Sequence, residues 1–450
     1  MGIIGFFASL ILLIVLTMRG VNIILAALLS TTLMAITNGL SLEKALTVDY
    51  MQGFTGYFAS WFLVYLLGAV FGKVMEETGA AASIAAWVKK TFGAHRAVFA
   101  TVAACAIMTY GGVSIAIVAF TVYPIAVALF REANLPHRFI PAALVFGSIS
   151  FTMTSPGSPE IKNLIPMEFF GTQPTAGGWI GFAAAAFIAM VGGLWLKRMV
   201  DRAIAKGEEF DAPQAVKEQA QEEAKEGLPS FVAAIAPLAL VIIILNIASN
   251  YLTASGAALL ALLIGSLTGL ALALPKTQAV HGITATGGGG PSFPKEMYSR
   301  IIAKGSENAI VATANICAVV GFGAVAQNTD TFKSIVDALV SMPGLEYAGL
   351  AAAVTIIAGI TGSASGGLGI ALPILAPLYG GQGLDPGAMH RISALAAGGL
   401  DSMPHNGYIV TTIRAVSNET HERAYKPIFV LSVIVPMIAL TLAVILYTLF

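Results

Sequence analysis

The longest apolar runs most strongly limit what this chain can fold into. Three of them are GIIGFFASLILLIVLTM (2–18), FVAAIAPLALVIIILNIA (231–248) and FVLSVIVPMIALTLAVILYTLF (429–450). Each approaches or reaches the roughly 20 residues that a helix needs to cross a bilayer. Only 11% of the residues are charged, whereas roughly a quarter are charged in a soluble domain. The sequence therefore predicts an all-α polytopic membrane protein, with the first run as a retained span because Arg19 and more apolar residues follow it.

Motifs of soluble enzymes are missing from the sequence. There is no HExxH, GxSxG or P-loop pattern. Cys105 and Cys317 lie in apolar stretches without metal-ligand spacing, so we expect small buried side chains and no metal site. A formal net charge of +0 argues against nucleic acid as a partner. We therefore expect neither an enzyme nor a cofactor other than a coupling ion.

One polar segment, residues 199–227, divides the chain into residues 1–198 and 228–450. The two parts share short matches in the same order. YGGVSIA (110–116) pairs with SGGLGIA (365–371), and His137-Arg138 pairs with His390-Arg391. Matches that keep their order and nearly the same spacing indicate an internal repeat. We expect a charged cytoplasmic linker between two repeats, and interfacial positions for His137 and His390.

Each repeat contains two short apolar pieces joined by glycines. The first pair covers 97–109 and 113–130, and the second covers 347–360 and 367–379. Because a glycine-rich joint at membrane depth must be buried in protein, we interpret each pair as a re-entrant hairpin. About five transmembrane helices remain in each half, one of them discontinuous. An odd number of crossings makes the two halves inverted-topology repeats.

The charge distribution orients this topology. With the linker in the cytoplasm, all but four of the 24 lysine and arginine residues fall on the cytoplasmic side. The exceptions are Lys44, Lys162, Lys333 and Arg391. This bias is what the positive-inside rule requires. We expect a multi-pass protein of the bacterial inner membrane with both termini on the outer side.

Four irregular segments contain the candidate site: the two hairpin tips and the two helix breaks. A broken helix leaves N–H and C=O groups without partners, and its N-terminal end attracts a carboxylate. The candidate substrate-binding residues are Tyr110, Gly111, Gly112, Ser114, Thr152, Thr154, Ser155, Ser158, Ser363, Ser365, Gly366, Gly367, Ser402 and Asn406. No arginine lies within these segments, so we expect helix ends and hydroxyl groups to bind a small organic anion.

Two ionisable residues in the second break, Asp401 and His405, are the candidates for proton or ion coupling. The alternatives are a helix-capping aspartate and a structural histidine. Glu160 and Lys162 lie at the end of the first break. Their sequence leaves open whether they belong to the site or only close its outer end.

Several of these stretches resemble one family of transporters. TYGGVSIAIVAFTVYPIAVALFREANLPHRFIPAAL (109–144), followed by SFTMTSPGSPEIKNLIP (150–166), resembles the gluconate permease (gluconate:proton symporter) family, and so does GGLDSMPHNG (398–407). The resemblance places the chain in the ion-transporter superfamily. It implies inverted repeats, re-entrant hairpins, a homodimer and elevator-type alternating access. It also implies import of gluconate, another sugar acid, D-serine or a short hydroxy acid such as 3-hydroxybutyrate, with the candidate residues above at the site.

The residues and the resemblance together predict a secondary active transporter that imports a small hydroxycarboxylate by proton symport. A Na⁺-coupled carboxylate symporter is the alternative within transport. A channel and an intramembrane enzyme are alternatives from other classes, although the enzyme would lack a positioned nucleophile. The glycines, prolines and serines could also serve only to let helices pack closely.

Overall fold

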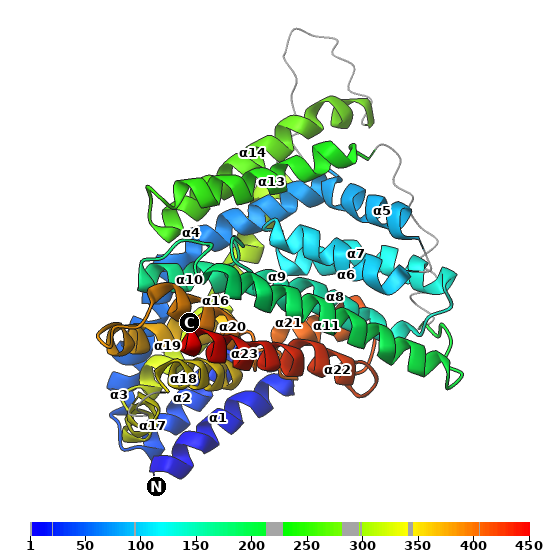
Figure 1. The fold of residues 1–450 in the computed structure, drawn as a ribbon. Coiled ribbons are helices and arrows are strands. Elements are labelled where there is room, and N and C mark those ends of the chain that lie inside the picture. Colours follow the sequence, from blue (N-terminus) through cyan, green and yellow to red (C-terminus); the bar gives the residue numbers. More distant parts are fainter. Residues whose placement is uncertain are drawn as a thin grey trace.

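The computed structural model describes residues 2–19, 21–93, 96–212, 228–280, 297, 299–340, 345–404 and 406–450. Within these residues the chain forms helices joined by turns, with no β-strand (Figure 1). Six of the described helical stretches are long and apolar enough to cross a membrane. They are Leu42–Glu77, Gly178–Ile204, Phe231–Ala248, Ala254–Leu272, Ile301–Ala326 and His421–Leu449.

The helices before the polar segment follow the predicted order. They are α1 (Gly2–Met18), α2 (Ile23–Thr37), α3 (Leu42–Lys44), η1 (Ala45–Asp49), α4 (Tyr50–Glu77), α5 (Ala80–Phe92), α6 (Ala97–Tyr110), α7 (Ile115–Glu132), η3 (His137–Phe139), α8 (Ile140–Ile149), α9 (Phe151–Thr154), α10 (Ile161–Phe170) and α11 (Gly178–Ile204). Helix α11 continues to Ile204, into the polar segment that we expected to begin at residue 199. Lys197 and Asp201 form an ion pair of 2.6 Å along this extension, which supports an exposed helical turn.

The helices after the polar segment repeat this order. They are α13 (Phe231–Ala248), α14 (Ala254–Val280), η4 (Arg300–Lys304), α16 (Gly305–Ala326), α17 (Asp330–Val340), α18 (Glu346–Thr361), α19 (Ala364–Gly380), α20 (Pro386–Ala397), α21 (Gly407–Val410), η5 (Thr411–Val416), α22 (His421–Phe429), η6 (Val430–Ile434) and α23 (Val435–Leu449). Each set therefore contains a long third helix, an amphipathic helix, a pair of short helices, a broken helix and a long last helix.

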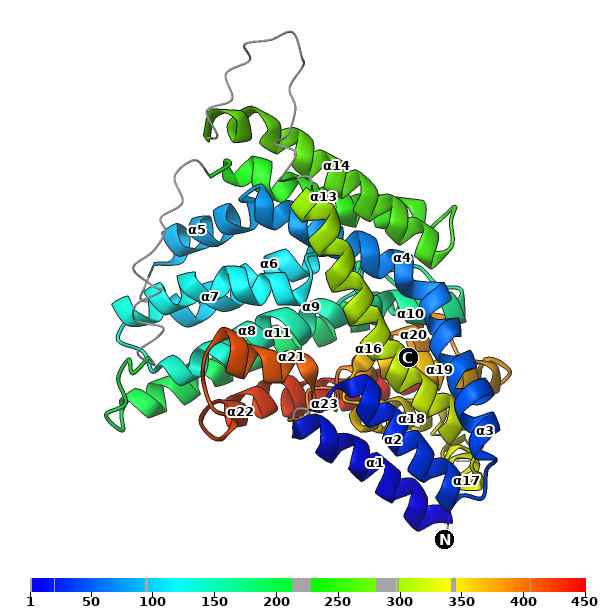
Figure 2. The ribbon, with the colours of Figure 1, turned by 180° about the vertical axis from the view of Figure 1, so that it is seen from behind.

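The long helices α4 and α16 pack closely against each other. A Cβ atom on Gly53 of α4 would lie 2.6 Å from the Ala324 Cβ of α16, and one on Gly321 would lie 2.8 Å from the Tyr50 carbonyl oxygen. Small residues let two helix backbones approach in this way. In Figures 1 and 2, α13 and α14 lie at one end of the α4–α16 pair, and α1 and α2 lie at the other end. The remaining helices lie beside this row.

The two pairs of short helices enter the molecule from opposite edges. Helices α6 and α7 occupy the right-hand half of Figure 1, whereas α18 and α19 occupy the left-hand half. Figure 2 shows the same arrangement from behind. The turns at the tips of both pairs, and both broken helices, therefore lie near the middle of the protein.

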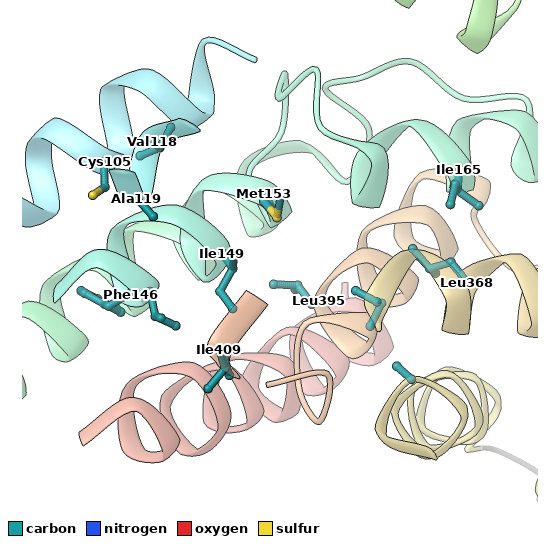
Figure 3. Packing of buried hydrophobic residues seen from close by; sticks show 14 of the residues in the cluster. Cys105, Val118, Ala119, Phe146, Ile149, Met153, Ile165, Leu368, Leu395 and Ile409 are labelled. Atoms are coloured by element: carbon teal, nitrogen blue, oxygen red, sulfur yellow. The ribbon is translucent and has the colours of Figure 1, made fainter. Parts of the chain in front are cut away.

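Apolar side chains surround these central segments. Figure 3 shows buried residues of α8, α9, α19, α20 and α21 around the breaks, among them Ile149, Met153, Leu368, Leu395 and Ile409. The predicted burial of Cys105 and Cys317 is confirmed, since both are fully buried free thiols. The polar groups of the breaks must therefore find partners inside an apolar core.

Residues 205–212, the described part of the polar segment after α11, dock onto helices from both halves. Arg138 donates hydrogen bonds of 2.7 and 2.9 Å to the carboxylate of Glu208, and Arg423 pairs with Asp211 at 2.5 Å. The bonds from Arg138 lower the pKa of Glu208 below its ordinary value. The start of the expected linker is thus attached to the ends of α8 and α22, while residues 213–227 lie outside the described residues.

The close packing of α18 against α19 can be tested by substituting a glycine at their contact. A Cβ atom on Gly367 would lie 2.5 Å from the Ala358 Cα atom, whereas one on Gly380 of the same helix would meet nothing within 4 Å. We expect G367A to destabilise the protein by about 1–3 kcal/mol, because the helices must separate. We expect G380A to be neutral or slightly stabilising. Thermal unfolding in detergent compares the two, and equal melting temperatures would contradict the close packing.

Candidate functional site

The first helix break separates α9, which ends at Thr154, from α10, which begins at Ile161. Its two threonine hydroxyls turn back onto their own helix: Thr152 donates to the Ser148 carbonyl at 2.6 Å, and Thr154 to the Ser150 carbonyl at 3.1 Å. These hydroxyls are therefore not free donors for a ligand. The break still exposes main-chain carbonyl groups at the end of α8 and α9, which carry partial negative charge.

Arg391 of α20 binds this carbonyl end. Its side chain is fully buried, and it donates to the carbonyl oxygens of Thr154 at 2.5 Å, Pro174 at 3.2 Å and Ala176 at 2.8 Å. No carboxylate pairs with it among the described residues. No arginine lies within the four segments, as the sequence shows, but Arg391 reaches the first break from the helix that precedes the second.

Lys162 joins the two breaks directly. Its ammonium group lies 2.9 Å from Asp401 Oδ2 and 3.1 Å from the Ile149 carbonyl oxygen. The side chains of Lys162 and Asp401 are only 4% and 5% exposed, so this is a buried ion pair. The pair answers part of the question left by the sequence: Lys162 belongs to the centre of the breaks and does not mark an outer end.

The second break is organised around Asp401 and Asn406. The Ser402 hydroxyl donates to Asp401 Oδ1 at 2.8 Å, so both carboxylate oxygens have partners. Asn406 Oδ1 accepts from the Ile409 N–H and thereby caps α21. Asn406, not Asp401, is thus the capping residue of this break. His405 lies outside the described residues.

The tip of the first short-helix pair meets the first break. The Tyr110 hydroxyl donates to the Pro156 carbonyl at 2.7 Å. Gly112 has a φ of +90°, which favours glycine, and a Cβ atom there would lie 3.3 Å from Pro159. Gly111 instead packs against Leu238 of α13, because a Cβ atom at Gly111 would lie 2.4 Å from that side chain.

The tip of the second pair meets the second break. Asn406 Nδ2 donates to the Gly362 carbonyl and to the Asp401 carbonyl, both at 3.0 Å. Ser363 caps α19 by accepting from the Gly366 N–H at 3.2 Å, and its hydroxyl lies 3.3 Å from that of Ser365. The structure therefore brings all four predicted segments together: tip to break in each half, and break to break through Lys162 and Asp401.

The candidate residues do not all face the same way. Ser114 and Ser155 are partly exposed. Ser158 is fully buried, and its hydroxyl accepts from the Glu160 N–H at 3.3 Å. Gly367 packs against α18. Only some of the predicted hydroxyl groups, among them those of Ser114 and Ser155, are exposed enough to contact a ligand.

His390 and Asn163 form a second buried connection between the halves. Asn163 Nδ2 donates to the Ser158 and Pro174 carbonyls at 2.9 Å each, which orients its oxygen toward His390 Nε2, also at 2.9 Å. Nε2 of His390 therefore carries a proton, and Nδ1 accepts from the Thr172 hydroxyl at 2.6 Å.

The expected interfacial positions of His137 and His390 were wrong, since both side chains are fully buried. His137 contacts Tyr123 and Glu419 at 2.9 and 2.8 Å. Sequence reasoning also missed Arg391 and Asn163 as residues of the breaks. One available signal was the rarity of charged residues within apolar helices, where they commonly have a function or a buried partner.

Comparison with solved structures identifies the class of this fold. The chain superimposes on the Alcanivorax borkumensis YdaH transporter with a TM-score of 0.52 and 16% identity, covering 90% of this chain and 87% of that one. It superimposes on the Neisseria gonorrhoeae antimetabolite efflux pump MtrF with a TM-score of 0.52 and 14% identity, covering 91% and 84%. The fold is that of helical membrane transporters.

Sequence comparison then identifies the family. A model of the GntP family permeases matches residues 1–400. The transporter YxjC of Bacillus subtilis is 34% identical over 86% of each chain, and a transporter of Haemophilus influenzae is 28% identical over 44% of this chain and 45% of its own. The chain belongs to the GntP permease family, which confirms the predicted resemblance, and it is a multi-pass membrane transporter.

The buried pair between Lys162 and Asp401 predicts non-additive stability effects. Removing one partner leaves a buried charge without compensation, which costs about 3–5 kcal/mol, whereas removing both can be nearly neutral. We expect K162M and D401N each to lower the melting temperature strongly, and the double variant to recover most of that loss. Unfolding can be followed with a thiol-reactive dye, because Cys105 and Cys317 are buried. Additive losses would show that the pair is not coupled in the folded protein.

Arg391 predicts a second stability effect. R391M removes the guanidinium donor from the Thr154 and Ala176 carbonyls, and each buried carbonyl that loses its partner costs about 1–3 kcal/mol. The Pro174 carbonyl keeps the Gly157 N–H and Asn163 Nδ2 as donors. We expect R391K to be intermediate, since a lysine keeps the charge but cannot reach all three oxygens. R198M on the exposed surface of α11 is the control, with an expected change within about 0.5 kcal/mol. Unfolding is again followed with the thiol-reactive dye. A loss of stability for R391M no larger than that for R198M would refute the role of Arg391 in binding these carbonyl groups.

Proposed function

We propose that this permease is a proton-coupled importer of a small hydroxycarboxylate, such as a gluconate-like sugar acid or a 3-hydroxybutyrate-like acid. The observation that carries the proposal is the junction of four polar, non-helical segments through the buried pair of Lys162 and Asp401. Each break supplies one half-helix whose N-terminal end favours an anionic group. The partly exposed hydroxyls of Ser114, Ser155 and Ser363 provide hydrogen bonds for a hydroxylated substrate.

Proton coupling accounts for the contacts of the first break better than Na⁺ coupling does. A Na⁺ site would use carbonyl oxygens at the C-terminal end of a broken helix. Here the Ile149 carbonyl accepts from the Lys162 ammonium group, and Thr154 accepts from Arg391. The protein's own cations thus occupy the position that a coupling cation would need at this break. We propose that coupling depends on Asp401, with His405 as a second candidate.

The proposed transport cycle uses two inverted repeats with re-entrant hairpins formed by α6–α7 and α18–α19. Their entry from opposite edges supports this topology (Figure 1). We further propose that the protein works as a homodimer of the bacterial inner membrane, with both termini outside and an elevator-type movement. The start of α1 and the end of α23 lie toward one edge of Figure 1, opposite residues 205–212, which supports that orientation.

Uptake into proteoliposomes tests the proposed function. We expect radiolabelled gluconate or 3-hydroxybutyrate to accumulate when the outside is made acidic, and accumulation to stop when a protonophore removes the gradient. Replacing Na⁺ by choline at constant pH should leave the rate unchanged. Uptake that ignores the pH gradient but requires Na⁺ would replace proton symport by the Na⁺-coupled alternative, and uptake without saturation would indicate a channel.

Asp401 allows a sharper test of coupling. We expect D401N to abolish accumulation driven by the pH gradient and to retain exchange of labelled for unlabelled substrate, because exchange needs no net proton movement. Thermal unfolding of the same preparation serves as the control. Accumulation by D401N at the wild-type level would exclude Asp401 from coupling, and a variant that cannot be purified in folded form would assign it a structural role.

A further inference from the structure

Glu160 lies at the end of the first break, directly before α10. Its main chain is well bonded, since its N–H donates to the Ser158 hydroxyl and its carbonyl accepts from Asn163 and Leu164. Among the described residues, its side chain makes neither a hydrogen bond nor an ion pair. It is partly exposed, whereas Ser158 and Pro159 before it are buried. The positive charge of Lys162 acts on this carboxylate without forming an ion pair with it. An acidic side chain that lacks an ion-pair partner inside a membrane transporter indicates a function.

The cations nearby are bound to other groups. Lys162, two residues further along, is held by Asp401 and the Ile149 carbonyl. Arg391 binds three carbonyl groups. His390 is a neutral imidazole in this arrangement, because Nε2 carries its proton and Nδ1 accepts from Thr172. Two tyrosines also lie near this loop: Tyr65 of α4, which interacts with Glu160, and Tyr110 of α6, which donates to the Pro156 carbonyl. These phenols are neutral near pH 7, so none of them compensates an ionised Glu160.

Glu160 also lies where a substrate would bind. Tyr65 interacts electrostatically both with Glu160 and with Ser365, which belongs to the α18–α19 tip. The Tyr57 and Tyr65 hydroxyls are 3.3 Å apart. Glu160 directly precedes α10, and α10 packs against α19 of the second pair of short helices. A substrate carboxylate held by the same segments would be close to the carboxylate of Glu160.

We infer that Glu160 is the residue that binds the transported proton, an inference that rests on the proposed function. Two carboxylates close together in a poorly hydrated site repel each other strongly. A proton taken from external water onto the Glu160 carboxylate removes this repulsion, so proton and anion bind cooperatively. After the site opens inward and the anion leaves, the proton passes to cytoplasmic water.

Asp401 then acts as a positioning residue for Lys162. While Asp401 and the Ile149 carbonyl hold the ammonium group, Lys162 forms no ion pair with Glu160. In D401N the ammonium group becomes available to Glu160, which would stay ionised without a proton. The loss of coupling expected for D401N therefore follows from the position of Lys162, and K162M in a D401N background should restore proton-dependent binding. D401N alone and the double variant should thus differ in the pH dependence of substrate affinity.

The decisive experiment compares E160Q with wild type in proteoliposomes, using whichever of gluconate and 3-hydroxybutyrate the wild type accumulates. The apparent affinity of the wild type should weaken by up to about tenfold per pH unit as the pH rises. E160Q should bind with an affinity that varies less than about twofold over the same range, exchange substrate and fail to accumulate it. E168Q is the matched control, because Glu168 lies on the same helix but is exposed, and it should behave as wild type.

Proton uptake on substrate binding provides a readout independent of transport. In weakly buffered detergent solution, a pH indicator should report proton uptake when wild type or E168Q binds the substrate, and none for E160Q. If E160Q retains the wild-type pH dependence and proton uptake, the inference is wrong while the proposed function stands. If the wild type itself shows no proton-driven uptake, the proposed proton symport is wrong, whatever the result for E160Q. If E160Q does not fold, E160D decides: a shifted pH profile supports the inference, and a profile identical to wild type overturns it.

Discussion

The structure depends on how the main-chain groups of two broken helices are satisfied away from water. At the first break, Lys162 binds the Ile149 carbonyl and Arg391 binds the Thr154 carbonyl. Unsatisfied carbonyls in an apolar core cost several kcal/mol in total. The cations that satisfy them need compensation in turn. Arg391 obtains it from further carbonyl groups, and Lys162 from Asp401. One electrostatic requirement therefore connects the first break both to α20 and to the second break itself.

This arrangement explains why the site is both rigid and charged. The tips of the two short-helix pairs are attached to the breaks through Tyr110 and Asn406. Lys162 and Asp401 then connect the two tip-and-break units. A change in protonation or in bound anion at this junction alters contacts in both halves at once. Such a junction is well suited to couple the binding of two different species, because neither can change its charge without affecting the other's surroundings.

Much of the fold could be predicted from the sequence because membrane helices are encoded locally. The limits of α6, α7 and α18 agree with the predicted short apolar pieces to within about two residues. The break between Thr154 and Ile161 followed from its prolines, glycine and serines, which cannot continue a helix. Side-chain direction was less predictable. Thr152 and Thr154 have hydroxyls of the right type, but they bond to their own helix. The positions of His137 and His390 were missed because an imidazole beside an arginine suits a membrane surface and a buried network equally well.

The sequence by itself determined that the chain crosses the membrane, where its helices break and which family it belongs to. These properties depend on hydropathy and backbone chemistry within short stretches. Only the tertiary structure decided which charged groups meet. Lys162 and Asp401 are 239 residues apart in the chain, and Arg391 and Thr154 are 237 apart. No local pattern records such pairings, because they result from the packing of α10 against α20. That packing pairs Lys162 with Asp401 and leaves Glu160 without an ion pair among the described residues, although Lys162 lies only two positions away in the sequence.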